Sequence, residues 1–180
     1  DGEQRAFRFH PLFVDLLNTQ LARRDPARRA AIACRAARWL ESNGRPSQAV
    51  AQALRGGDAE AAADVIERQA RAAIGRGEQR LAGHWLEALP ETVIRRRPRL
   101  CLDRAWVQLH AGQTASVGQW LDAADSALPA AAEGLRNTLH GESLTLRAYL
   151  AAGEPEQALT LVRRATALIA NDDHEVNGLI

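Results

Sequence analysis

The chain has 180 residues, enough to bury a sizeable core, and its predominance of Ala and Leu with only 4% aromatic residues favours helix over strand. The formal net charge is +1, so the basic excess typical of nucleic-acid-binding proteins is missing and we expect no direct nucleic-acid contact. The chain contains Arg but no Lys, which excludes a Walker-type phosphate loop and a lysine nucleophile.

The first residues predict a strand followed by a helix. Residues 5–10 alternate polar and apolar side chains, which is typical of a short, half-buried strand. Pro11 suits the first turn of a helix, and Phe13 and the leucines that follow recur at helical spacing as far as about Arg23. The later sequence predicts helices alone.

Glycine turns divide the rest of the chain. Asp25 and Pro26 are typical of a helix start, and Asn43 with Gly44 predicts a helix end capped by a left-handed glycine. Residues 171–180 look like the beginning of one more helix. Further turns separate helical segments of roughly 10 to 20 residues, and they lie at Gly57, Gly77, Gly112 and Gly153.

These glycines mark an internal repeat. Each is followed eight residues later by a pair of large apolar residues: Val65-Ile66, Trp85-Leu86, Trp120-Leu121 and Leu161-Val162, in chain order. The last three glycines are separated by 35 and 41 positions, close to the roughly 34-residue unit of tetratricopeptide repeats. The pattern predicts an all-α fold of helical hairpins stacked into a tetratricopeptide-like superhelix, an α-α solenoid.

Several segments resemble a known family. Residues 7–17 are similar to the end of the winged-helix region in MalT-like transcriptional regulators, the ATP-binding members of the LuxR family. Residues 37–50, 56–63 and 85–106 resemble the first helices of that family's tetratricopeptide-like superhelical domain. The resemblance implies that residues 1–24 are the C-terminal end of a winged-helix domain. Residues 25–180 would then form a helical-repeat domain that is truncated at its C-terminal end.

The resemblance also implies a function. Regulators of this family combine a nucleotide-binding ATPase core, a helical-repeat sensor and a DNA-binding helix-turn-helix domain. This chain has neither a phosphate loop nor a recognisable helix-turn-helix, so ATP binding and DNA binding would belong to other segments. We therefore expect an effector-sensing and protein-interaction module whose partners are a small-molecule effector, a protein or a second copy of the chain. The alternative is a helical-repeat scaffold that binds a peptide or a partner and senses no small molecule.

No set of residues predicts catalysis. The five His residues are scattered without the i, i+4 pairing of a zinc site, and no nucleophile and base are suggested by spacing. We therefore expect no enzyme, no metal and no cofactor in this chain. Inner helices of tetratricopeptide-like arrays line a concave groove, and the candidate groove contacts on them are His84, Trp85, Arg104, Gln108 and Tyr149.

Other conspicuous residues have structural interpretations. The basic run at residues 95–99 is interpreted as a solvated interhelical loop, with contact to an anion or acidic partner as the alternative. The four Trp residues are expected to fill space between helices. Cys34 and Cys101 are expected to be buried free thiols, a disulfide being the alternative. The chain lacks the roughly 18-residue apolar run of a membrane span, so we expect a cytoplasmic protein with no membrane contact.

Overall fold

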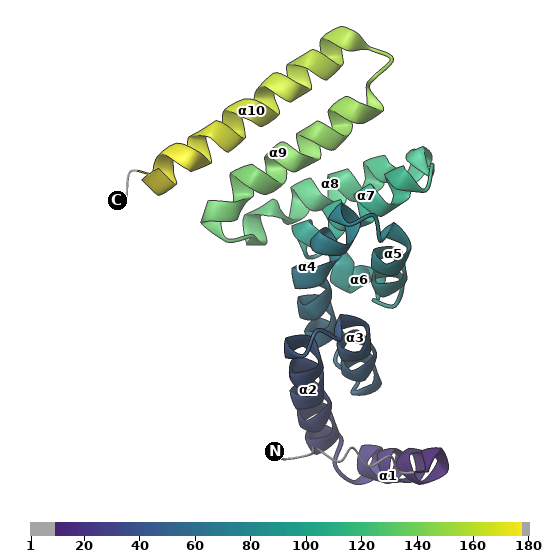
Figure 1. The fold of residues 1–180 in the computed structure, drawn as a ribbon. Helices are drawn as coiled ribbons and strands as arrows, with labels where there is room; N and C mark the ends of the chain where they lie inside the picture. Colours follow the sequence, from purple (N-terminus) through teal and green to yellow (C-terminus); the bar gives the residue numbers. More distant parts are fainter. Residues whose placement is uncertain (1–9, 178–180) are drawn as a thin grey trace, which may run out of the picture. The chain divides into compact units, whose positions relative to one another are not determined.

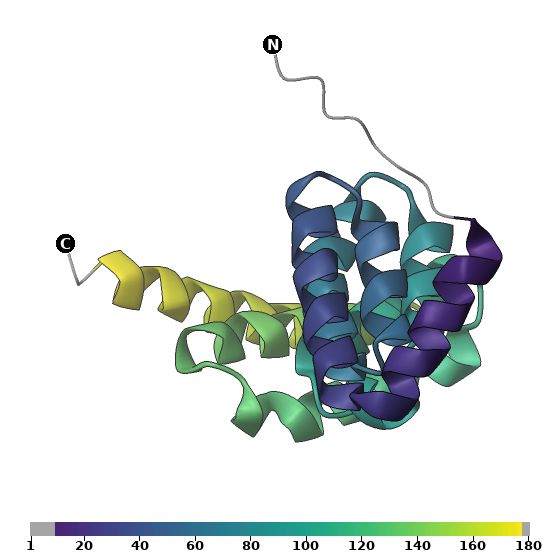
Figure 2. The same cartoon turned by 90° about the horizontal axis from the view of Figure 1, so that it is seen from below.

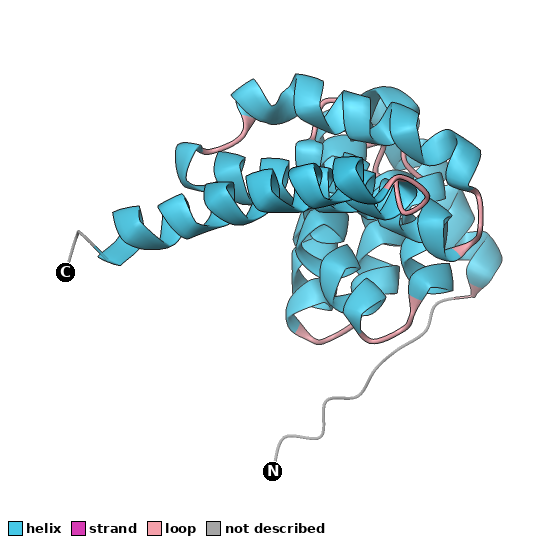
Figure 3. Cartoon of the chain, turned by 90° about the horizontal axis from the view of Figure 1, so that it is seen from above, coloured by secondary structure: helices cyan, strands magenta, loops and turns pink. Residues whose placement is uncertain are grey.

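The computed structural model describes residues 10–177, and every regular element in that range is a helix (Figures 1 and 3). The predicted all-α class is thereby confirmed for this part of the chain. The strand predicted for residues 5–10 lies outside the described residues except for His10, which is the residue preceding the first helix. Among the helices described, none is long and apolar enough to cross a membrane.

The helices follow one another along the chain with short connections (Figure 1). Short 3-10 turns at Thr114–Ser116 and Leu128–Ala130 flank α8. The contacts divide the chain into two compact units, the first ending at Ala61 and the second starting at Ala62. The helices are α1 (Pro11–Arg24), α2 (Pro26–Ser42), α3 (Pro46–Arg55), α4 (Ala59–Gly75), α5 (Gln79–Glu87), α6 (Glu91–Ile94), α7 (Pro98–His110), α8 (Val117–Ala127), α9 (Glu133–Leu150) and α10 (Pro155–Asn177).

The first unit is built around a hairpin of α2 and α3, which lie side by side in Figures 1 and 2. The Asp25 side chain caps α2 by accepting a hydrogen bond of 2.8 Å from the Arg28 backbone N–H, as expected for a helix start. Small buried residues let the two helices approach closely. A Cβ added at Gly56 would overlap the Ala33 side chain, so this position has room only for glycine.

One turn geometry recurs four times. Gly44, Gly57, Gly77 and Gly112 all have positive φ, between 70° and 83°. After α4, for example, the Glu78 N–H donates to the Ala73 carbonyl at 2.9 Å and the Gly77 N–H donates to the Ile74 carbonyl at 3.0 Å. This is the Schellman motif, which satisfies two free carbonyls at a helix end and needs a left-handed residue. The left-handed cap predicted at Gly44 is confirmed.

The apolar pairs that follow these glycines are mostly buried. Three of the four predicted pairs, after Gly57, Gly77 and Gly112, are at most 5% exposed. The fourth pair differs: Val162 is 45% exposed and Leu161 is only half-buried. The turn before this pair also differs, because Gly153 does not have positive φ.

The second unit has its core around α7. The largest fully buried side chains are aliphatic and come from α4, α5, α7, α8 and α9, and they include Ile66, Leu86, Leu100, Leu121 and Leu146. Beyond this core, α9 and α10 form a long hairpin (Figure 1). Residues 171–177 continue α10 without a break, so the further helix predicted to begin there is not a separate element in the described residues.

The Trp and Cys residues differ in their surroundings. Trp85 and Trp120 are buried as predicted, Trp106 is half-buried, and Trp39 is 58% exposed, so the prediction of a core position is wrong for Trp39. Both Cys residues are free thiols. Cys101 is buried, and burial raises its pKa to about 12, so it stays a thiol at neutral pH. Cys34 is only half-buried.

The recurrent turn can be tested with a matched pair of glycines. Gly77 has a φ of +83°, whereas Gly75, the last residue of α4, has open space around it and no positive φ. We expect Gly77→Ala to lower the free energy of unfolding by about 1 to 2 kcal/mol, because a Cβ is strained in the left-handed region. Gly75→Ala should leave it unchanged or raise it slightly. Urea unfolding measures both; equal effects would contradict the turn assignment.

Candidate functional site: a groove beside a buried charge network

The polar face of α5 forms one wall of a groove in the second unit. Positions 79, 80, 83, 84 and 87 recur at helical spacing and share one side of α5, with His84 and Glu87 exposed. The other side carries Trp85 and Leu86, which are buried. The sequence period therefore sets an apolar side against the core and leaves a polar side open.

The opposite wall is the end of α7. Val107, His110 and Ala111 complete a groove of about 690 Å³ with the polar face of α5. A Cβ added at Gly83 would lie 3.1 Å from the Val107 Cγ1 atom, so the glycine allows α5 and α7 to approach closely at this point. We call this surface the α5–α7 groove.

The groove combines charges of both signs with two imidazoles. Arg80 and Glu87 line it together with His84 and His110. Such a lining provides hydrogen-bond donors and acceptors and a small apolar floor, which suits binding of a polar ligand or a peptide segment. Within residues 10–177, no group of three or more His, Cys, Asp or Glu residues is arranged to hold a metal ion.

The five residues predicted as groove contacts are not brought together. His84 lines the α5–α7 groove. Trp85 is 2% exposed and Gln108 is 9% exposed, and the Gln108 Oε1 atom accepts a 2.9 Å hydrogen bond from the Ser116 hydroxyl, so both side chains serve the core. Arg104 is half-buried, with its guanidinium 5.9 Å from the centre of the Trp120 ring.

Tyr149 lies elsewhere, on α9, and is 67% exposed. Sequence reasoning missed Arg80, Glu87 and His110, which line the groove beside His84. The spacing of polar residues around Gly83 was the available signal for the first two. His110 is brought to the site only by the packing of α7 on α5.

The basic run at residues 95–99 is largely paired within the unit. The Arg97 Nη1 atom lies 2.6 Å from Asp64 and 3.0 Å from Glu67, both on α4. The Arg99 Nη1 atom lies 2.8 Å from Glu142 on α9. The interpretation of this run as a solvated loop is therefore wrong for Arg97 and Arg99, because long-range ion pairs hold them against neighbouring helices.

Glu142 is the centre of this charge network. Its carboxylate accepts from Arg71 at 2.6 Å, from Arg99 at 2.8 Å and from the Trp106 indole N–H at 2.8 Å. Only 11% of the Glu142 side chain is exposed. The Arg71 guanidinium also lies 5.4 Å from the centre of the Trp106 ring, a cation–π distance. One carboxylate thus links α4, α7 and α9.

Asp103 lies fully buried on α7 and faces the same network. Among the described residues, no donor is within hydrogen-bond distance of either of its carboxyl oxygens. Burial raises its pKa to about 7, the positive charges of Arg99 and Arg71 oppose that rise, and the negative charges of Glu142 and Glu67 add to it. Near neutral pH the group is therefore about half protonated, since a carboxylate without donors is costly to bury.

The protonation of Asp103 makes stability depend on pH. Its pKa is higher in the folded state than the 3.8 of the free group, so folding favours the protonated form. This contribution is complete below about pH 4 and is lost as the pH rises through about 7. We expect Asp103→Asn to remove this pH-dependent part of the free energy of unfolding, which amounts to about 1.4 kcal/mol for each unit by which folding shifts the pKa. Urea unfolding of both proteins from pH 4 to pH 8 measures the difference, and parallel pH curves would contradict the assignment.

The role of Glu142 can be tested against a surface pair. Glu142→Gln removes the charge that pairs with Arg71 and Arg99, and we expect it to lower the free energy of unfolding by about 1 to 3 kcal/mol. The control is Glu91→Gln, because Glu91 is 61% exposed and pairs with Arg95 one helical turn away. That change should cost less than about 0.5 kcal/mol. Equal losses of unfolding free energy in the two variants, measured by thermal or urea unfolding, would show that the Glu142 ion pairs stabilise the fold no more than a surface pair does.

Comparison with known proteins finds no family model that matches this chain and no solved structure that matches it significantly.

Proposed function

We propose that this chain is the effector-sensing and protein-interaction module of a MalT-like transcriptional regulator. Two kinds of observation support this. The segments at residues 37–50, 56–63 and 85–106 resemble the repeat domain of that family. In addition, four helices (α2, α3, α4 and α7) end in the same glycine-capped turn, and buried apolar pairs follow three of these turns at a fixed offset. Both features are typical of helical-repeat proteins, which bind ligands and partners on extended surfaces.

The α5–α7 groove is the main support for a binding function. It has about 690 Å³ of space and a mixed lining of charged, imidazole and apolar groups. Two of its residues have contacts within the unit: the His110 Nδ1 atom lies 2.8 Å from the Trp106 backbone carbonyl, and Glu87 makes a long 3.9 Å contact with Arg104. Arg80 and His84 are exposed on this concave surface, and a concave surface with exposed polar groups is the usual location of a ligand site.

A scaffold that binds a peptide is the second candidate. The open groove between two helices also suits an extended or helical peptide segment, since charges of both signs can pair with side chains of a partner. The two candidates differ in what occupies the groove, so one experiment with two kinds of probe distinguishes them.

The groove is tested by thermal unfolding in the presence of a metabolite library and, separately, a peptide library. A ligand at 100 times its dissociation constant should stabilise the fold by about 2.7 kcal/mol. The double variant Arg80→Gln with His84→Ala changes exposed groove residues and should abolish the stabilisation. Arg163→Gln is the matched control, because Arg163 is exposed on α10 and outside the groove.

Each outcome has a clear meaning. Stabilisation by a metabolite that only the groove variant loses would support effector sensing, and the same pattern with peptides would support the scaffold. Stabilisation that survives the groove variant would contradict the assignment of the groove as the site.

The regulator assignment is tested by sequencing the gene on both sides of this segment. We expect it to encode a Gly-Lys-Ser/Thr phosphate loop before the segment and a helix-turn-helix after it. A reading frame without them would overturn the MalT-like proposal.

A further inference from the structure

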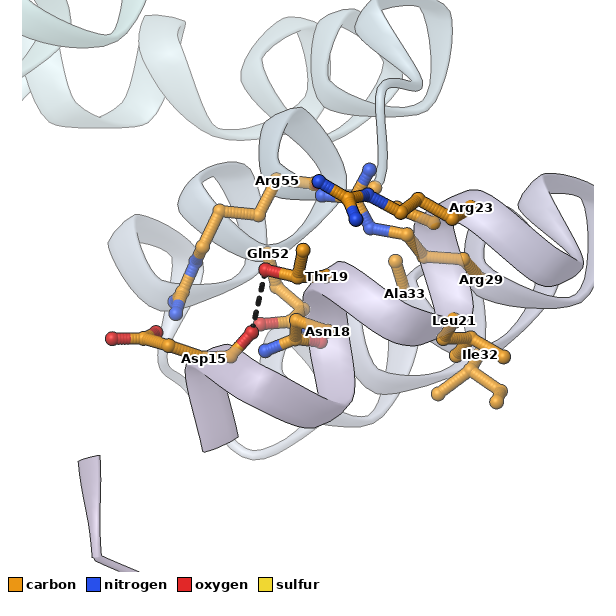
Figure 4. A pocket seen from close by; sticks show the side chains of 12 residues that line it. Asp15, Asn18, Thr19, Leu21, Arg23, Arg29, Ile32, Ala33, Gln52 and Arg55 are labelled. Atoms are coloured by element: carbon orange, nitrogen blue, oxygen red, sulfur yellow. Dashed lines mark hydrogen bonds between the residues drawn. The ribbon is translucent and has the colours of Figure 1, made fainter. Parts of the chain in front are cut away.

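A second cavity lies in the first unit, where α1, α2 and α3 meet. It has a volume of about 500 Å³ and is lined on its polar side by Asn18, Gln52 and three arginines, Arg23, Arg29 and Arg55. Figure 4 shows the Arg23 and Arg29 side chains close together, with the apolar Leu21 and Ile32 grouped below them, whereas the Arg55 side chain extends in the other direction, toward Asp15. We call it the arginine cavity.

The arginines of this cavity lack carboxylate partners. In the part of the chain that the structure describes, the Arg23 side chain makes no hydrogen bond or ion pair. The Arg55 side chain uses only its Nε atom, at 3.3 Å from the Ala51 carbonyl. Asp15 is the single acidic residue in the lining. The arginines of the second unit differ: Arg97, Arg99 and Arg147 each pair with acidic side chains.

One arginine is held in place by the backbone. The Arg29 guanidinium donates from Nη2 to the Arg55 carbonyl at the end of α3. This bond uses one of the five N–H donors of the guanidinium and leaves the others for a ligand. In Figure 4 the Arg23 and Arg29 side chains both extend toward this end of α3, so two positive groups from different helices approach the same region.

Two guanidinium groups without carboxylates, in a cavity with amide donors, match the chemistry of an oxyanion. We propose that the arginine cavity binds a small molecule that carries a phosphate or a carboxylate group. The anionic group lies between Arg23 and Arg29, and Asn18 and Gln52 bind polar groups of the remaining molecule. The cavity volume is in the range of small-molecule sites. This proposal concerns the first unit only and does not rest on the α5–α7 groove or on the regulator assignment.

The adjacent arginine pairs in the sequence supply matched variants. Arg23→Gln and Arg29→Gln remove charges that line the cavity, whereas Arg24→Gln and Arg28→Gln remove the same charge from neighbouring exposed positions outside the lining. Calorimetric titration of the full chain at constant ionic strength uses inorganic phosphate and succinate as probes. The stronger of the two identifies the anionic group as phosphate or as carboxylate.

We expect saturable binding of at least one probe and a loss of about tenfold or more in affinity for each cavity variant. The two control variants should remain within about twofold of the parent chain, because long-range charge effects are screened. Circular dichroism establishes that the variants keep their helix content, and Arg23→Gln breaks no side-chain hydrogen bond or ion pair within the described residues.

Three results would overturn the proposal. The first is the absence of saturable binding by either probe. The second is an equal loss of affinity in the cavity and control variants, which would indicate nonspecific attraction to a basic surface. The third is binding of a DNA duplex at low salt that weakens equally in all four variants while the small anions do not bind. That pattern would assign these arginines to a diffuse nucleic-acid contact.

Discussion

The fold depends on a backbone constraint at the ends of its helices. A helix end leaves carbonyls without partners, and a left-handed residue lets the chain turn back and satisfy two of them at once. Gly44, Gly57, Gly77 and Gly112 supply this conformation. Because the chain reverses at a set distance from each glycine, the residues eight positions later meet the core, as Trp85 and the other pairs of the second unit show. Where Gly153 does not adopt the conformation, the following pair is not buried.

In the second unit, the packing of whole helices and not the glycine turn decides which charged side chains meet. Glu142 receives two arginines and an indole N–H from two other helices, and Asp103 lies close to it without a donor of its own. Glu142 is a largely buried carboxylate whose charge is balanced by hydrogen-bond donors. Asp103 is buried without donors, and burial therefore raises its pKa. Their proximity couples the stability of the core to pH. Packing of the same helices also pairs Arg97 and Arg99, which look free in the sequence, with acidic side chains on α4 and α9.

The arginines of the charge network and those of the arginine cavity therefore have different surroundings. In the second unit, acidic residues on α4, α8 and α9 neutralise arginines that would otherwise attract anions. In the first unit, Arg23 and Arg29 have no such partners among the described residues, and their guanidinium groups remain available. The formal net charge of +1 conceals this local difference, because a whole-chain sum does not show where opposite charges meet.

The sequence by itself determined the helical class, the left-handed turn at Gly44 and the buried pairs after Gly57, Gly77 and Gly112. These follow from local backbone preferences and from the helical period. Tertiary structure alone decided which polar residues meet. His84 and His110 are 26 positions apart and Arg99 and Glu142 are 43 apart. No local rule relates residues so distant, because their approach depends on how whole helices pack. For the same reason the core position predicted for Trp39 and the groove contact predicted for Gln108 were wrong: the period of a helix shows which side is apolar but not what covers it.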